Sequence, residues 1–139
     1  MNYRRVAILS SIIIAIGFLV FFDYQKVLSD FRNLKSLLNE TRHAAITTGR
    51  SLIVRFNDKE AQLLSFSGTP IRKMEISTLH KVNYDTTRGK GVIVFTPTGT
   101  HPYNLRVHGG DIRLKSWFGF EKNIAVNCYG LVSEGVYPE

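Results

Sequence analysis

The hydrophobic residues begin with an unbroken apolar run near the start of the chain. The run extends over 17 residues from Val6 to Phe22, with Arg4 and Arg5 before it and Asp23 after it. As an α-helix, with about 1.5 Å of rise per residue, it reaches roughly 26 Å, the short end of what spans a bilayer. We therefore predict a single-pass membrane anchor at residues 1–23. The residues predicted to form the anchor surface are Val6, Ile12, Ile13, Ile14, Gly17, Phe18 and Phe22.

The flanking charges predict the orientation of this anchor. Basic residues beside a membrane helix stay in the cytoplasm, so Arg4 and Arg5 predict a cytoplasmic N-terminus in the bacterial inner membrane and a periplasmic remainder. A cleaved secretory signal or a buried core helix is the alternative. The run is long for the apolar core of a signal, and residues 21–26 contain no A-x-A-like cleavage site.

An amphipathic pattern follows the apolar run without a linker. Apolar residues recur every three or four positions over residues 24–49, which predicts a helix with one buried side that continues the anchor. Asp30 is expected on the opposite, polar face, and Gly49 is placed to end the helix. The residues predicted to pack on the rest of the protein are Val27, Phe31, Leu34, Leu38 and Ala45.

From residue 50 the pattern changes to short β-rich runs separated by turns. Residues 51–56 and 61–66 predict a hairpin, and glycines punctuate the later runs. We expect residues 50–139 to form a periplasmic β domain, an antiparallel sheet or small sandwich that the helix covers, which makes the fold class α+β. The further predicted strands are Ile71–Ser77, His80–Tyr84, Gly91–Phe95, Tyr103–Val107, Asp111–Phe118, Asn123–Asn127 and Leu131–Ser133.

Composition and the spacing of polar residues limit the classes of protein to which the chain can belong. Of the 139 residues, 44% are hydrophobic and 21% charged, which is ordinary globular usage and excludes a disordered or collagen-like chain. The single cysteine, Cys128, excludes an intramolecular disulfide and is expected to be a buried apolar residue. The four histidines and the carboxylates lack the spacing of a zinc or catalytic signature, and no phosphate-binding glycine loop occurs. We therefore predict no enzyme activity, no metal and no cofactor.

The chain is basic, with a net charge of +7. Without Arg4 and Arg5, 16 basic residues still face 11 acidic ones, which leaves +5 for the remainder. Alternation along the predicted strand at 111–118 places Arg113, Lys115 and Trp117 on one face. Three interpretations stay open: a core-edge tryptophan beside solvated cations, a protein contact, or a nucleic-acid surface that binds phosphates and stacks on bases.

Three stretches carry a resemblance to a known family. They are the helix end and first strand at 37–56, the segment G-V-I-V-F-T-P-T-G-T at 91–100, and N-I-A-V-N-C-Y-G-L-V at 123–132. In this order after a long helix, they resemble the GspH/FimT family of minor pseudopilins. The resemblance implies a pilin-like structural subunit of a type II secretion system or type IV pilus, N-methylated after processing. It also implies other pilin-like subunits and secreted cargo as partners.

The sequence departs from the family pattern at two places. The residues around Arg5 contain neither the usual cleavage site nor the glutamate at the fifth mature position, so processing is in question or the start lies further upstream. Leu131 and Ser133 stand where DNA-binding members of the FimT branch carry arginines. Two alternative functions therefore stay open: a DNA-binding minor pilin for DNA uptake, and a membrane-anchored periplasmic accessory that never enters a filament.

Overall fold

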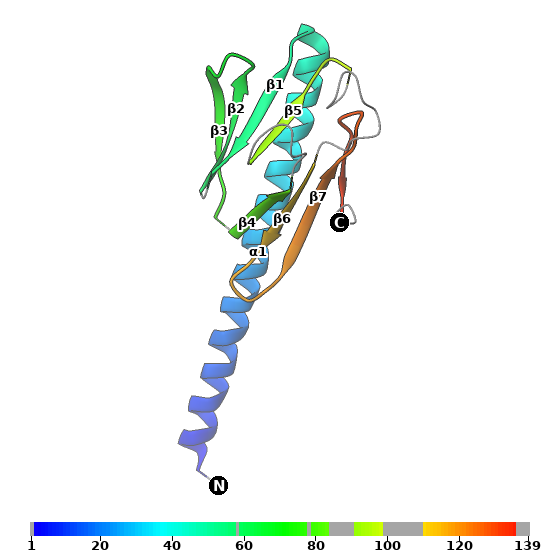
Figure 1. Cartoon of the computed structure of the whole chain (residues 1–139). Helices are drawn as coiled ribbons and strands as arrows, with labels where there is room; N and C mark the ends of the chain where they lie inside the picture. Colours follow the sequence, from blue (N-terminus) through cyan, green and yellow to red (C-terminus); the bar gives the residue numbers. More distant parts are fainter. Residues whose placement is uncertain (1, 58, 78, 84–90, 99–109, 136–139) are drawn as a thin grey trace.

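The computed structural model describes residues 2–57, 59–77, 79–83, 91–98 and 110–135. Its largest element is one uninterrupted helix, α1 (Tyr3–Thr48) (Figure 1). The Asn2 side chain caps its start by accepting a hydrogen bond from the Arg4 backbone N–H at 3.2 Å. Gly49 ends it with a φ of 65°, a left-handed conformation that favours glycine. The predicted continuous helix through the apolar and amphipathic segments is confirmed.

The β domain follows α1 and consists, in the described part of the chain, of short strands joined by turns. Those strands are β1 (Leu52–Phe56), β2 (Glu60–Ser65), β3 (Pro70–Glu75), β4 (Leu79–Asn83), β5 (Val92–Phe95), β6 (Gly110–Lys115), β7 (Glu121–Val126) and β8 (Val132–Glu134). The predicted hairpin is present as β1 and β2, with Leu52 opposite Ser65 and Phe56 opposite Ala61. The predicted strand Tyr103–Val107 lies outside the described residues.

In the described residues the strands form two four-stranded antiparallel sheets. The orders are β3-β2-β1-β5 and β4-β6-β7-β8. α1 contacts β1 and β5 of the first sheet and β6, β7 and β8 of the second, so the C-terminal half of the helix is packed against both sheets (Figure 1). The N-terminal half projects from the β domain as a bare stem. The predicted α+β, pilin-like class is thereby confirmed.

One hydrophobic core joins the helix and the two sheets. Leu34 and Leu38 of α1, Val54 of β1, Phe95 of β5 and Ile124 of β7 are all fully buried members of it. Along β1 and β5 buried residues alternate with partly buried or exposed ones, as expected for strands with one face on a core. The amphipathic half of α1 is thus the shared cover of both sheets.

Two predictions made from periodicity are wrong in detail. The predicted strand Asp111–Phe118 ends at Lys115, because a tight turn closes there through a bond from the Gly119 N–H to the Ser116 carbonyl at 3.0 Å. Asp30 does not lie on a solvated face. It is only 6% exposed and accepts hydrogen bonds from the Ser77 N–H at 3.0 Å and the Ser77 hydroxyl at 3.1 Å, which tie α1 to the segment after β3.

Gly130, in the turn between β7 and β8, provides a test of this packing. Its φ is 80°, and a Cβ added there would lie 3.4 Å from Phe95 Cδ1 and 3.5 Å from Arg42 Cδ. We expect Gly130→Ala to lower the free energy of unfolding by about 1–3 kcal/mol, through backbone strain and crowding together. Gly68→Ala is the matched control, since Gly68 has a φ of 93° and open space around it. Urea unfolding of both variants would measure the difference, and equal losses would contradict close packing at Gly130.

Candidate assembly surfaces

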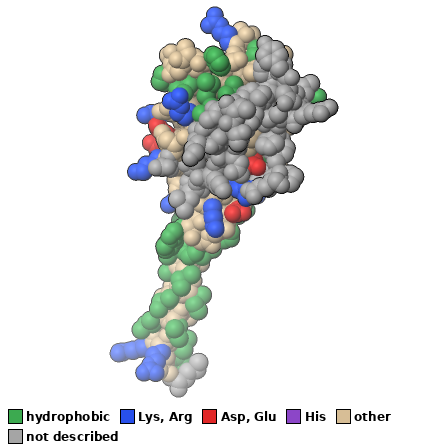
Figure 2. Space-filling model, in the orientation of Figure 1, with side chains coloured by type: hydrophobic (Ala, Val, Ile, Leu, Met, Phe, Trp, Pro, Cys, Tyr) green, Lys and Arg blue, Asp and Glu red, His purple; other side chains and the backbone are tan. Residues whose placement is uncertain are grey.

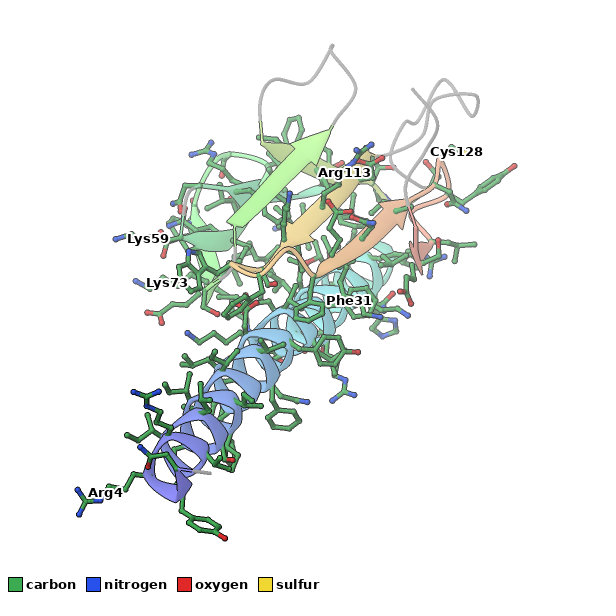
Figure 3. The ribbon with its side chains drawn as sticks, turned by 90° about the horizontal axis from the view of Figure 1, so that it is seen from below. Arg4, Phe31, Lys59, Lys73, Arg113 and Cys128 are labelled. Atoms are coloured by element: carbon green, nitrogen blue, oxygen red, sulfur yellow. The ribbon has the colours of Figure 1, made fainter. Side chains whose placement is uncertain are left out.

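The N-terminal half of α1 is an exposed apolar surface. Every residue predicted to form the anchor surface is exposed, and hydrophobic side chains cover the stem in Figure 2. Arg4 lies at the far end of this stem (Figure 3). The hydroxyls of Ser10 and Ser11 bond at 2.9 Å to the carbonyls four residues earlier, so their polar atoms are satisfied within the helix. Such a segment is long and apolar enough for a membrane and fits a single-pass anchor.

A shallow hollow interrupts this apolar surface at Gly17. It measures about 330 Å³ and is lined by Ile14, Gly17, Phe18 and Phe21. The hollow exists because Gly17 has no side chain and nothing lies within 4 Å of where its Cβ would be. Small residues on membrane helices allow another helix to approach closely. The hollow therefore leaves room for another surface to approach α1 closely at Gly17.

The predicted packing residues lie between the helix and the sheets. Val27, Phe31, Leu34, Leu38 and Ala45 are all at most 8% exposed and belong to the common core. At the edge of the core, the ammonium groups of Lys35 and Lys122 lie 5.9 and 5.5 Å from the centre of the Phe31 ring, within cation–π range. These side chains hold the β domain on the helix and leave the apolar stem free.

Asp23, the first charged residue after the apolar run, ties the helix to the turn between β6 and β7. Its Oδ1 accepts a hydrogen bond from the Trp117 N–H at 3.1 Å and its Oδ2 one from the Phe118 N–H at 2.9 Å. Desolvation raises the pKa of Asp23, but hydrogen bonds from Ser116, Phe118 and Trp117, with the charge of Lys26, outweigh it and leave the pKa below its usual value of 3.8. Asp23 is therefore ionised at neutral pH, and this tie weakens only as the pH falls through the lowered pKa.

The three residues predicted to share one face of a strand do not all lie on it, because β6 ends at Lys115 and Trp117 follows in the turn. Ile112 and Leu114 point into the core, whereas Arg113 is half-buried and Lys115 exposed on the opposite face. Arg113 lies on the side of β6 away from α1 (Figure 3). Trp117 follows the strand, in the turn, and is 84% exposed, so it does not cover the core edge. Nucleic-acid and protein binding at these three residues stay predictions.

A second apolar surface lies where α1 ends. A groove of about 920 Å³ runs between the helix end and the first sheet, and Phe66 and Ile71 beside it are exposed by 70% and 58%. Its described lining is Ala44, Thr48, Arg50, Ser51, Leu52, Leu63, Ser65, Phe66, Ser67 and Ile71. Sequence patterning does not indicate this groove, because Phe66 continues the alternation of one predicted strand and Ile71 begins the next.

The described side chains that could bind a metal ion do not cluster. In the ranges the structure describes, no three His, Cys, Asp or Glu side chains come together as a set that could hold a metal ion. His43 is exposed on α1, while His101 and His108 lie outside the described residues. Cys128, expected to be buried, is half-buried in the turn after β7 (Figure 3).

Comparison with known proteins finds solved structures of similar fold but no match to a protein-family model or a curated sequence. The fold is similar to that of the type IV minor pilin FimU of Pseudomonas aeruginosa. One crystal form matches with a TM-score of 0.62 and 14% identity over 83% of this chain and 92% of that one. A second form matches with a TM-score of 0.56 and 16% identity, over 78% and 91%.

The fold is also similar to that of a minor pseudopilin. EpsH from the type 2 secretion system of Vibrio cholerae matches with a TM-score of 0.58 and 7% identity, over 80% of this chain and 97% of that one. A likeness at such low identity speaks for the fold. The long helix packed on antiparallel sheets is therefore the minor pilin and pseudopilin fold that the GspH/FimT resemblance implied.

Proposed function

We propose that this protein is a minor pilin-like or pseudopilin-like structural subunit that acts by assembly, in a type II secretion system or a type IV pilus. The observation that carries the proposal is the division of α1. Its C-terminal half packs against a β domain of minor pilin fold, whereas its N-terminal half exposes a largely apolar surface. A folded domain does not need such a stem for its own stability, so the stem serves a membrane and other helices.

In this proposal the stem has two successive partners. Before assembly it crosses the bacterial inner membrane with Arg4 and Arg5 in the cytoplasm and the β domain in the periplasm. During assembly it packs against the equivalent helices of other pilin-like subunits. Because lipid provides no hydrophobic drive for helices to associate, close packing must stabilise the contact. The hollow at Gly17 supports such packing.

The β domain then presents the exterior surface of the assembly. The groove beside Phe66 and Ile71 lies at the end of α1 farthest from the stem, where it is free to meet another subunit or a secreted protein. In this role the subunit makes and breaks no covalent bond. Its specificity comes from the shape and the apolar character of the surfaces that it presents.

Affinity isolation from native membranes tests the proposal. Full-length tagged protein, extracted in mild detergent, is expected to bring other pilin-like subunits with it, as identified by mass spectrometry. Gly17→Ile fills the hollow and is expected to reduce their recovery severalfold while the protein stays in the membrane fraction. Gly17→Ala is the matched control and should keep most of them. Recovery of the protein alone, in all three forms, would instead favour the membrane-anchored accessory.

A further inference from the structure

We propose that the turn between β6 and β7 inserts into the headgroup layer of the membrane and docks the base of the β domain on the lipid surface. The turn comprises Ser116, Trp117, Phe118 and Gly119, and we call it the aromatic turn. The inference rests on the proposed membrane span at Val6–Phe22. It adds a second membrane contact, made by a segment far from the helix in sequence.

The geometry fixes the level of the aromatic turn along α1. Both carboxylate oxygens of Asp23 accept backbone N–H groups of the turn, from Trp117 at 3.1 Å and Phe118 at 2.9 Å. Asp23 directly follows Phe22, the last residue of the apolar run. In Figure 1 the turn is the part of the β domain nearest the bare stem. If the stem lies in lipid, the turn therefore lies where the hydrocarbon ends.

The side chains of the turn suit that level. Trp117 is 84% exposed and Phe118 45% exposed, and their rings touch edge to face with centroids 5.1 Å apart. Tyr24, also exposed, adds a third aromatic ring at the same level through its edge contact with Phe120. Tryptophan and tyrosine concentrate at the membrane–water interface, where the apolar ring meets lipid and the polar atom meets headgroups or water.

The length of the apolar run and the nearby charges also favour a contact between the aromatic turn and lipid. At roughly 26 Å the run is shorter than a hydrocarbon core of about 30 Å, so its flanking residues are drawn toward the bilayer. Lys26, whose charge helps to lower the pKa of Asp23, and Lys115, two residues before Trp117, are both exposed. Their ammonium groups are placed to meet anionic phospholipid headgroups.

This contact restricts the orientation of the membrane-bound subunit relative to the bilayer. A single membrane helix lets the whole subunit tilt in any direction. A second contact on one side of the helix favours the tilt that keeps the turn at the headgroup level, and so holds that side of the β domain toward the membrane.

Trp117 is the only tryptophan and thus a native probe of depth. The full-length protein would be reconstituted into vesicles of phosphatidylethanolamine and phosphatidylglycerol, and flotation would verify membrane association. We expect blue-shifted Trp117 emission and severalfold stronger quenching by lipids brominated near the headgroup than by lipids brominated at the chain end. Iodide in the aqueous phase should quench it weakly.

Two variants serve as references. The double substitution Trp117→Phe with Tyr129→Trp moves the probe to an exposed position in the β7–β8 turn, where strong iodide quenching and no lipid quenching are expected. Asp23→Ala removes the tie to the turn and should lower the lipid quenching of Trp117 while flotation persists.

The outcomes separate this inference from the proposed function. Protein that floats with vesicles while Trp117 is quenched by iodide as strongly as the probe at position 129 would overturn the inference and leave the anchor intact. Protection of Trp117 from both iodide and brominated lipid would also overturn it, since that pattern indicates a contact between copies of the chain. Failure to float at all would refute both the anchor and the docked turn.

Discussion

Ile13→Arg is expected to release the protein from the membrane. Ile13 lies near the middle of the apolar run and is 69% exposed, so the arginine would have no protein partner in a lone helix. At the centre of a membrane helix, arginine costs about 3 kcal/mol to insert, whereas isoleucine favours insertion by roughly 0.5 kcal/mol. The difference of about 3.5 kcal/mol corresponds to a shift of more than 100-fold toward the non-inserted form, because about 1.4 kcal/mol is a factor of ten.

Carbonate extraction of native membranes measures this effect. The unsubstituted protein should stay in the membrane pellet, and the Ile13→Arg variant should move to the supernatant or be degraded. Ile13→Leu, which keeps the position apolar, is the matched control and should behave like the unsubstituted protein. An arginine variant that remains fully integral would contradict a span centred on Ile13.

Phe95→Ala is expected to destabilise the β domain strongly. Phe95 is fully buried at the end of β5, opposite Leu52 of β1, and its ring lies close to Gly130 in the turn that joins two strands of the second sheet. It therefore joins the two sheets as well as filling the core. Truncation of a buried phenylalanine costs about 3–5 kcal/mol, a large part of the roughly 5–15 kcal/mol that stabilises a typical domain.

Urea unfolding of the full-length protein in detergent, followed by far-ultraviolet circular dichroism, would measure the loss. With a slope of about 2 kcal/mol per molar urea, the midpoint should fall by roughly 2 M. Phe66→Ala removes the same side chain from a position that is 70% exposed and should change the free energy of unfolding by less than about 0.5 kcal/mol. Similar losses from both variants would contradict the assignment of Phe95 to the core.

The helix and the first hairpin are predictable because their signals are local. The unbroken apolar run, the spacing of Val27, Phe31, Leu34 and Leu38, and the left-handed stop at Gly49 each depend on residues within a few turns of one another. Periodicity also separates the inward Ile112 and Leu114 from the outward Lys115.

The connections between distant segments are not predictable in this way. Asp30 bonds to Ser77, and Asp23 bonds to a turn 94 residues away, yet both aspartates fit a solvated or terminal position in the helical pattern. The sequence does not indicate that β6 ends at Lys115. Trp117 continues the alternation of the strand, although its backbone already lies in a turn. The separation into two sheets depends on strand pairing, which the order of strands along the chain does not determine.

Cross-linking in native membranes tests the assembly of this protein most directly. Cysteine would be introduced at Gly17 in a Cys128→Ser background, so that the stem carries the only thiol. A second cysteine would be introduced in the apolar helix of another pilin-like subunit of the same cells, and a mild oxidant would be added. We predict a disulfide between the two subunits, at a level that falls severalfold when the cysteine of this protein is placed instead at the exposed Ile46 of the β-domain half of α1. A stem thiol that forms no adduct with any pilin-like subunit while the assembly machine is active would contradict a role for this protein in a filament.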